Sequence, residues 1–329
     1  MKKTLIALAA VAVTGGAFAQ ATITGDFSFG YSSASTAPVS SKSLPGGTSG
    51  GMGMGDADVY FAATEALDGG TTIGVNLALD LANNTAAYGQ AAVVGDETMF
   101  IKTASGLKLT VGSEKGADYL SGGIAAAGSN FNQTFDNSLF TSRDFKDFIS
   151  VSLPVAEGIK LGVKHRETGT GIGAGAGAYQ GATAQRDTTV SIDIANGPLV
   201  VNAGYRAYDA NVSTSSSVSS SLNRASASYD LGVAKIGAGY STVIYGYGNS
   251  RTDTLAGITV PVTAALTLGA QAGQRATSGN ATNTNYSGAI YSGSYALSKR
   301  TSFVASYIDY DSGATTHNTG YAMKLFTTF

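Results

Sequence analysis

Apolar and polar side chains alternate one by one along most of the chain beyond residue 19. Residues 73–81 carry Ile, Val or Leu at the odd positions and polar or small residues at the even positions. The same two-residue period recurs in 159–166, 198–208 and 265–275. Because successive side chains of a β-strand point to opposite faces, the pattern predicts many short strands, each with one apolar face.

The alternation predicts an all-β chain of sixteen strands. Most are 8–12 residues long, which suits the roughly 9–11 residues of a tilted strand that crosses a bilayer. The pattern leaves the facing of 96–104, 286–297 and 300–310 ambiguous. The expected strands are 21–31, 56–66, 71–81, 96–104, 107–115, 146–153, 159–168, 187–195, 198–208, 222–230, 233–242, 251–260, 264–275, 286–297, 300–310 and 319–329.

Connections of two lengths alternate between these strands. Short ones, such as 68–70, 105–106 and 196–197, contain the Gly, Asn and Asp residues that favour tight turns. Outer-membrane barrels have short periplasmic turns and long external loops. We therefore expect one antiparallel transmembrane β-barrel over 20–329, with both ends on the periplasmic side. The long segments are 32–55, 82–95, 116–145, 169–186, 209–221, 243–250, 276–285 and 311–318.

Charged residues are concentrated in the row that alternates with the apolar row. In a closed barrel that row faces water, whereas Lys or Arg on the lipid face costs about 2–4 kcal/mol at the midplane. About 16 strands enclose an aqueous channel. A soluble β-helix would need a repeat of about 20–30 residues, and the chain shows no such repeat. The expected inward charges are Asp26, Asp80, Lys108, Glu114, Lys160, Lys164, Arg166, Asp193, Arg206, Arg224, Lys235, Asp253 and Arg275.

Residues 1–19 have the features of a cleaved secretory signal peptide. Lys2 and Lys3 precede an apolar run, and Ala17-Phe18-Ala19 is a cleavage site of the A-x-A type. Cleavage leaves 20 − 2 = 18 basic residues against 22 acidic ones, a net charge of about −4. Such a chain is a poor nucleic-acid binder, so no nucleic-acid partner is expected. The absence of Cys excludes disulfides, thiolate metal sites and a Cys nucleophile.

Three strings of the sequence carry a resemblance to a known family. They are the first expected strand 21–31 (ATITGDFSFGY), the turn 295–301 (YALSKRT) before an aromatic strand, and the alternating strand that ends on Phe329. Together they resemble the Gram-negative general porins of the β-proteobacterial type. The resemblance implies a homotrimer of 16-stranded barrels in the outer membrane, in contact with lipid and lipopolysaccharide. It implies passive diffusion of ions and small hydrophilic solutes without a cofactor, and it makes Phe329 the signal read by the assembly machinery.

In this family the third external loop folds into the lumen and narrows it, and segment 116–145 matches that loop. The resemblance makes Asp118, Asp136, Arg143 and Asp144 the candidate constriction residues. The segment lacks the Pro-Glu-Phe-Gly string of many relatives, so which of its acids lies at the constriction stays open.

Inward basic residues form the other candidate wall of the pore. They outnumber acids on the inward rows of 102–168 and 198–240, which predicts a weak anion preference. The alternative is that these charges only solvate a wide lumen or pair with one another. The candidate residues are Lys108, Lys160, Lys164, Arg166, Arg206, Arg224 and Arg275.

Other candidate sites are weaker. His165, on an outward row, and His317, in an expected loop, are isolated, so neither predicts a metal site. The Gly-rich stretch 169–178 lacks the Lys-Ser/Thr of a phosphate-binding loop. A catalytic dyad of His317 with Asp309 or Asp311 is conceivable, but no enzyme is expected. An adhesin or structural barrel that acts through its external loops is the alternative function.

Overall fold

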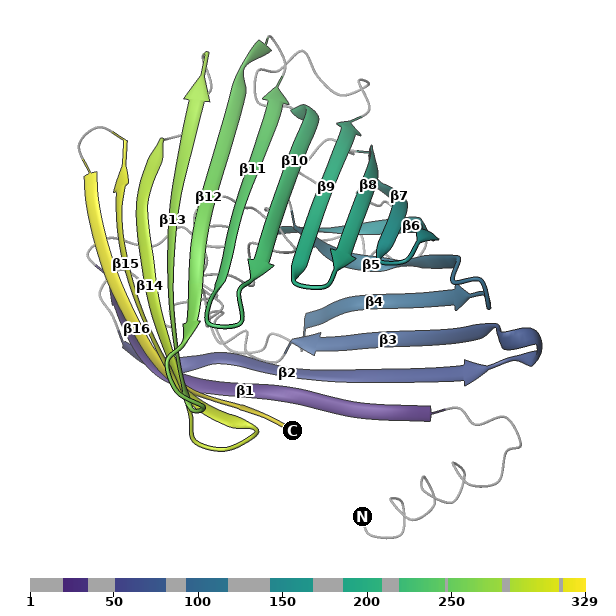
Figure 1. The fold of residues 1–329 in the computed structure, drawn as a ribbon, viewed down its shortest axis with the longest axis horizontal. Helices are drawn as coiled ribbons and strands as arrows, with labels where there is room; N and C mark the ends of the chain where they lie inside the picture. Colours follow the sequence, from purple (N-terminus) through teal and green to yellow (C-terminus); the bar gives the residue numbers. More distant parts are fainter. Residues whose placement is uncertain are drawn as a thin grey trace.

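The fold is a closed antiparallel β-barrel (Figure 1). The computed structural model describes residues 20–34, 51–80, 93–117, 143–167, 186–208, 219–245, 248–279, 285–313 and 316–329. Within these ranges sixteen strands follow one another around the barrel. They are β1 Gln20–Ala34, β2 Gly51–Ala66, β3 Thr72–Asp80, β4 Val93–Lys102, β5 Lys108–Ala117, β6 Arg143–Ala156, β7 Ile159–Glu167, β8 Arg186–Asn196, β9 Leu199–Tyr208, β10 Ser219–Asp230, β11 Lys235–Tyr245, β12 Ser250–Pro261, β13 Leu266–Ser278, β14 Tyr286–Ala296, β15 Thr301–Ser312 and β16 Thr316–Thr328.

Strand β1 closes the barrel by pairing with β16. Their register runs from Asp26 opposite Thr328 to Ala34 opposite Gly320. Each other neighbouring pair is also adjacent in sequence. A closed sheet has no edge, so the strand N–H and C=O groups find partners inside the wall, as a bilayer requires.

All sixteen predicted strands are present, but several extend further than the alternation indicated. Strand β2 begins at Gly51 rather than 56, and β6 begins at Arg143 rather than 146. A β-bulge between Phe27 and Phe29 shifts the register of β1 against this early part of β2. Backbone pairing thus continues into segments that lack a regular apolar row. The hydrogen bonds between strands join backbone groups and need no particular side chain.

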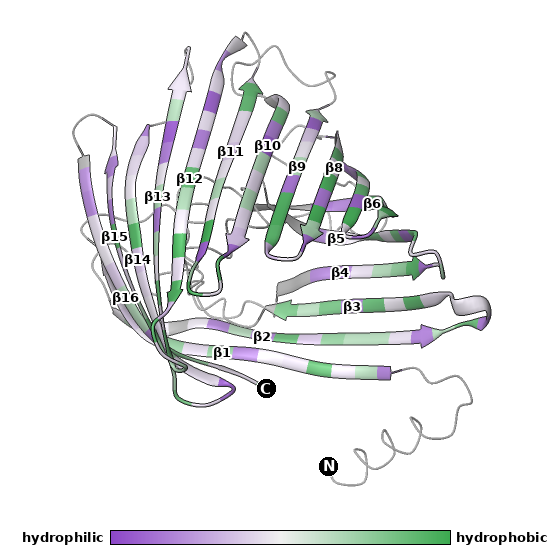
Figure 2. Ribbon diagram, viewed as in Figure 1, coloured by the Kyte–Doolittle hydropathy of each residue, from purple (hydrophilic) through white to green (hydrophobic). Residues whose placement is uncertain are grey.

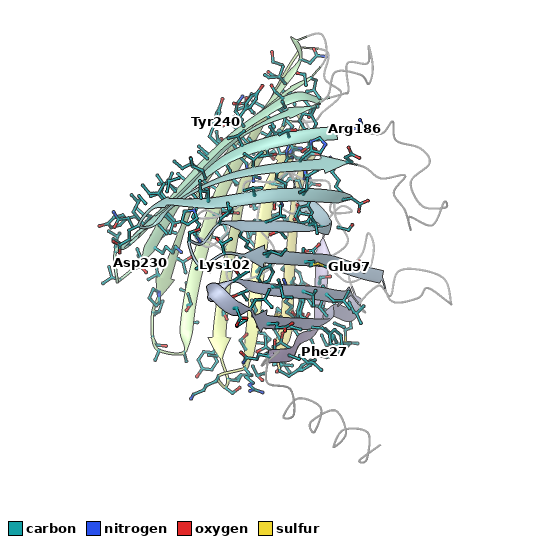
Figure 3. All side chains as sticks on the ribbon, turned by 90° about the vertical axis from the view of Figure 1, so that its right-hand side faces the viewer. Phe27, Glu97, Lys102, Arg186, Asp230 and Tyr240 are labelled. Atoms are coloured by element: carbon teal, nitrogen blue, oxygen red, sulfur yellow. The ribbon has the colours of Figure 1, made fainter. Side chains whose placement is uncertain are left out.

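The barrel has an apolar outer face, as the alternation predicted. Large apolar side chains on one row of each strand are exposed, among them Val75, Val163 and Leu325. Figure 2 shows the alternation of hydrophobic and hydrophilic residues along the strands. The same exposure settles two of the ambiguous strands, since Met99 and Phe303 lie on this outer row. All side chains of the described residues are drawn in Figure 3.

The inner row is polar over much of the wall but not everywhere. On β12, β14 and β15 an apolar cluster of Leu255, Ile290, Ile308 and Tyr310 is buried on the inner side. Apolar side chains therefore pack against one another on this part of the inner side.

Glycine shapes the short turns. Gly106, with φ of 88°, closes the turn between β4 and β5, where its N–H donates to the Thr103 carbonyl over 2.9 Å. That backbone conformation suits a residue without a Cβ. Among the described residues, no helix has the length and apolar character needed to cross a membrane.

Candidate functional site

Among the described residues, three cations of the inner wall gather around one carboxylate. Arg166 Nε lies 2.8 Å from Asp187 Oδ1, and Lys146 Nζ lies 3.2 Å from Asp187 Oδ2. Arg206 Nε reaches Asp187 Oδ1 over 3.4 Å. We call Lys146, Arg166, Asp187 and Arg206 the Asp187 cluster. It joins four adjacent strands, β6 to β9, and the formal charges of its four side chains sum to +2.

The side chains of the Asp187 cluster are buried. The Asp187 side chain is fully buried and Arg166 is 2% exposed. Arg166 donates from both Nε and Nη2 to the two carboxylate oxygens, at 2.8 and 2.9 Å. Arg206 Nε also donates to Thr189 Oγ1 over 2.9 Å. A two-pronged Arg–carboxylate pair of this kind fixes orientation as well as charge.

The basic surface continues from the Asp187 cluster along β7. Lys164 Nζ lies 2.7 Å from Glu114 Oε1 and 4.3 Å from the centre of the Phe148 ring. Lys108, on β5, likewise lies over the ring of Phe100 at 4.2 Å. An ammonium group over an aromatic face gains a cation–π attraction.

A second group of inner charges lies on β12 and β13. Arg275 Nε donates to Asp253 Oδ1 over 2.8 Å, and Arg251 Nε lies 3.2 Å from Asp253 Oδ2. The Arg275 guanidinium is also 5.5 Å from the Tyr286 ring centre. Two cations share one carboxylate here, so this group carries a net charge of about +1.

Acidic residues gather on β1 and β2, on the other side of the barrel. Asp26 and Asp58 are directly opposed in the register, and the Tyr60 hydroxyl lies 3.3 and 3.2 Å from their carboxylates. Asp56 is paired instead with Lys324 Nζ at 2.7 Å. In the closed ring of sixteen strands, β1 and β8 are seven positions apart, nearly half the circumference. The inner wall therefore has an acidic side and a basic side.

The remaining predicted basic residues occupy positions on the same inner row. Lys160, on β7, is directly opposite Asp193 of β8. Arg224, on β10, is directly opposite Gly204 of β9 and Ser241 of β11. These positions fit the predicted basic wall, and the transport role of each residue stays a prediction.

The expected constriction residues fall into two groups. Asp118 and Asp136 lie outside the described residues. Arg143 and Asp144 were expected in the loop, but they belong to β6, where they pair with Ala117 and Gly116. The strand ladder extends to Arg143 because β5 continues to Ala117, so these two residues are strand residues and the connection is shorter than 116–145.

Sequence reasoning missed two members of the Asp187 cluster and one further lysine. Lys146 was not among the candidate wall residues, and Asp187 was overlooked although it begins the same row as Asp193. Lys102 lies on β4, whose facing was ambiguous, and it is directly opposite Lys108. Register across strands, which the alternation does not give, was needed to find these relationships.

His317 is exposed and His165 is half-buried. His165 Nδ1 is 2.9 Å from Thr188 Oγ1. His317 was expected in a loop but belongs to β16, where its Nδ1 is 3.0 Å from Asp311 Oδ1 and its Nε2 is 3.5 Å from Asp309 Oδ1. Among the described residues no group of His, Cys, Asp or Glu is suited to hold a metal ion. The Gly-rich stretch 169–178 lies outside these residues.

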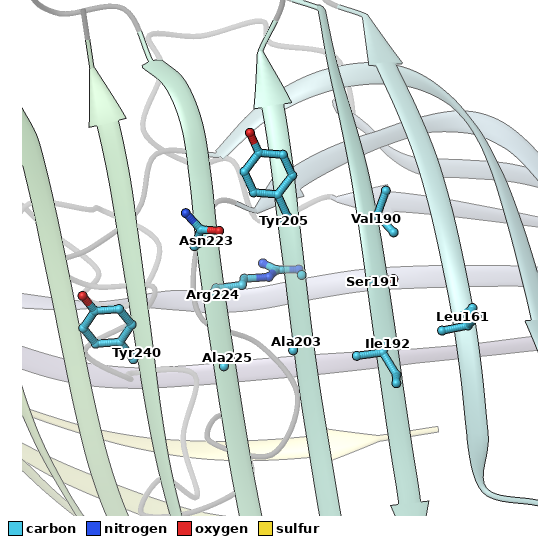
Figure 4. A pocket seen from close by; sticks show the side chains of 11 residues that line it. Leu161, Val190, Ser191, Ile192, Ala203, Tyr205, Asn223, Arg224, Ala225 and Tyr240 are labelled. Carbon is cyan, nitrogen blue, oxygen red and sulfur yellow. The ribbon is translucent and has the colours of Figure 1, made fainter. Parts of the chain in front are cut away.

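A pocket of about 560 Å³ lies on β7–β11, and Arg224 is the one charged residue among those that line it. Figure 4 shows the side chains that line it, including Leu161, Val190, Ile192, Tyr205 and Tyr240. All five lie on the apolar outer row. This hollow is therefore part of the lipid-facing surface, formed where the small residues Ala203 and Ala225 lie between larger ones.

Comparison with known proteins agrees with this architecture. The family described as Gram-negative porin matches residues 4–315. The fold is similar to the anion-selective porin from Comamonas acidovorans, with a TM-score of 0.66 and 15% identity over 94% of this chain and 100% of that chain. It is also similar to a triple mutant of Rhodopseudomonas blastica porin, with a TM-score of 0.67 and 12% identity over the same shares. No curated protein matches the chain in sequence.

A closed barrel with an apolar outside and a charged inside defines a membrane channel. The family match covers most of the chain, and the chain belongs to the Gram-negative porin family. Its place is accordingly the outer membrane.

Proposed function

We propose that residues 20–329 form a diffusion channel for ions and small hydrophilic solutes with a weak preference for anions. The observation that carries this proposal is the separation of charge on the inner wall. The Asp187 cluster and the Arg251–Asp253–Arg275 group each carry net positive charge. Fixed charge along a pore raises the local concentration of counter-ions, here anions.

The acidic side of the wall limits this preference. Asp26 and Asp58 lie side by side on β1 and β2, and they attract cations to the far side of the lumen. A channel with both signs of charge passes both ions and selects weakly. The anion-selective porin from Comamonas acidovorans, which shares the fold, is consistent with a preference in this direction.

Export, assembly and partners are part of the same proposal. Residues 1–19 act as a signal peptide whose removal leaves Gln20 first, and Phe329 is recognised by the outer-membrane assembly machinery. The channel is a homotrimer that contacts lipid and lipopolysaccharide. The exposed aromatic residues Phe27, Phe29 and Phe61 on β1 and β2 supply an apolar surface for contact between subunits.

Conductance of the refolded mature chain tests the proposal. The chain is inserted into a planar bilayer, single-channel steps are counted and the reversal potential is read in a salt gradient. The proposal expects steps in groups of three and a reversal potential on the anion side. Folded, heat-modifiable protein that gives no conductance would instead support a barrel that acts through its loops.

A further inference from the structure

Two lysines lie side by side on the inner wall where β4 turns into β5. Lys102, the last residue of β4, is directly opposite Lys108, the first residue of β5. Both belong to the inner row, because their strand neighbours Ile101 and Leu109 are exposed on the outer row. Like charges directly opposite one another in a sheet repel and destabilise it. A pair that works against the stability of the barrel points to a role outside folding.

No acid in the described part of the chain neutralises this pair. Lys108 Nζ lies 4.2 Å from the centre of the Phe100 ring, and neither lysine makes an ion pair or a hydrogen bond with another described residue. Lys102 is exposed and Lys108 is half-buried, so ions in the lumen can reach both side chains. The neighbouring inner row is uncharged and consists of Gly74, Phe100, Thr110 and Ser150.

Other lysines of the inner wall are matched with acids. Lys146 lies 3.2 Å from Asp187, and Lys324 lies 2.7 Å from Asp56. Lys164, which like Lys108 lies over an aromatic ring, is also 2.7 Å from Glu114. The positive charge of Lys102 and Lys108 is therefore offered to ions in the lumen, whereas the charge of these other lysines is met by the wall itself.

A hydroxyl group flanks each lysine on the same inner row. Thr72 of β3 is directly opposite Lys102, and Ser152 of β6 is directly opposite Lys108. Both are half-buried, and within the described ranges neither hydroxyl makes a hydrogen bond. Neighbouring strands are about 4.8 Å apart, so the four side chains form a row of donors about 14 Å long. We call Thr72, Lys102, Lys108 and Ser152 the lysine row.

Two ammonium groups between two hydroxyls suit an oxyanion that carries two charges, such as inorganic phosphate. Hydrogen bonds from an ammonium group to a phosphate oxygen are about twice as strong as those between neutral groups. A doubly charged ion also offsets the repulsion between Lys102 and Lys108, which a single chloride does only in part. The chemistry of the lysine row thus favours phosphate-like ions over chloride.

We propose that the lysine row is a weak binding site for doubly charged oxyanions at the periplasmic mouth of the channel. The row lies beside the short turn 103–107, and outer-membrane barrels have their short turns on the periplasmic side. Exposure to water keeps the binding weak, and a conducted ion must leave a site as readily as it enters. The inference rests on the proposed channel function and adds a class of solute to it.

Lys235 provides a matched control at the same end of the barrel. It is the first residue of β11, and it lies on the inner row because Ile236 is exposed on the outer row. Lys235 is directly opposite Asp230 of β10, so an acid already faces it. Removing its charge should leave the lysine row unchanged.

Phosphate binding to the refolded mature barrel in detergent tests the assignment. At low ionic strength, the barrel should broaden the phosphorus NMR line of inorganic phosphate, and high salt should reduce this effect because screening weakens the attraction. K102Q/K108Q should lower the broadening severalfold, whereas K235Q and the charge-preserving K102R should match the wild type. No broadening by the wild type, equal broadening by K102Q/K108Q, or the same loss in K235Q would overturn the assignment.

Folding and conduction separate the remaining explanations. Because the two charges repel, K102Q/K108Q should yield at least as much heat-modifiable folded barrel as the wild type. A lower yield would show that the pair serves the fold and would contradict the inference. A wild-type barrel that binds phosphate through the lysine row but gives no conductance would contradict the proposed function and leave the site standing. A conducting wild type that binds no phosphate would contradict the site alone.

Discussion

Phe329, the last residue, is joined to Gly25 of β1 by two backbone hydrogen bonds. Gly25 N donates to Phe329 O over 3.2 Å, and Phe329 N donates to Gly25 O over 3.0 Å. A Cβ on Gly25 would overlap the Phe329 ring and lie 2.6 Å from the Asp58 carbonyl oxygen. The terminal ring therefore occupies the space that a side chain at position 25 would need, and the seam between the two ends of the chain depends on this glycine.

A Gly25→Ala variant should close its barrel poorly. The added methyl group forces the Phe329 ring or the β1–β2 backbone to shift, so the folded fraction and the temperature of heat modification should both fall. Gly51→Ala on β2 is the matched control, because a Cβ at Gly51 meets nothing within 4 Å. The folded fraction of each variant is measured on a gel that separates folded protein from heat-denatured protein. Equal folded fractions for the two variants would contradict the claim that barrel closure depends on Gly25.

The ion pair between Lys324 of β16 and Asp56 of β2 joins the two ends of the barrel wall on its inner side. Lys324 Nζ lies 2.7 Å from Asp56 Oδ2, and Ser28 Oγ donates to the same oxygen over 2.8 Å. Lys324→Met leaves the mostly buried carboxylate without its cation, so we expect the free energy of unfolding to fall by about 1–3 kcal/mol. The measurement is urea unfolding in lipid vesicles. Adding Asp56→Asn should recover part of the loss, and no recovery would argue against a direct pair.

The acidic side of the lumen should restrain the anion preference. Asp58→Asn removes one negative charge beside Asp26, so the reversal potential in a salt gradient should move further to the anion side. Asp147→Asn is the control, because Asp147 is an exposed acid of the outer row, directly opposite Ser113 and Glu167. A shift of the same size in the control would show that net charge, and not the inner wall, sets the selectivity.

The two faces of a single strand should respond differently to a new charge. Val190, on the outer row of β8, is 53% exposed, and Ser191 is the next residue on the inner row. Val190→Lys places a cation in lipid, which costs about 2–4 kcal/mol near the midplane, so its insertion into vesicles should fail or weaken. Ser191→Lys should insert normally. Similar insertion of both would contradict the assigned facing.

The sequence predicted the strands because a strand's side-chain period is short and local. Val75 and Val163 could be assigned to the outer face from their neighbours in sequence alone. The charge clusters needed more, since Arg166 and Asp187 meet only when β7 and β8 are placed in register across a long connection. Strand ends were also missed where backbone pairing continues beyond the last residue of the alternating apolar row. Arg143 and His317 were therefore expected in loops. The two-residue period says nothing of either relationship.

The reversal potential of a variant that neutralises the cations of the Asp187 cluster tests the central claim most directly. The variant is Lys146→Gln, Arg166→Gln, Arg206→Gln and Asp187→Asn together, which changes the net charge of the cluster from about +2 to zero without adding bulk. Measured beside the wild type in the same salt gradient, the wild type should reverse on the anion side and the variant should move toward zero or the cation side. Equal reversal potentials in two folded, conducting channels would contradict the claim that this part of the inner wall selects ions.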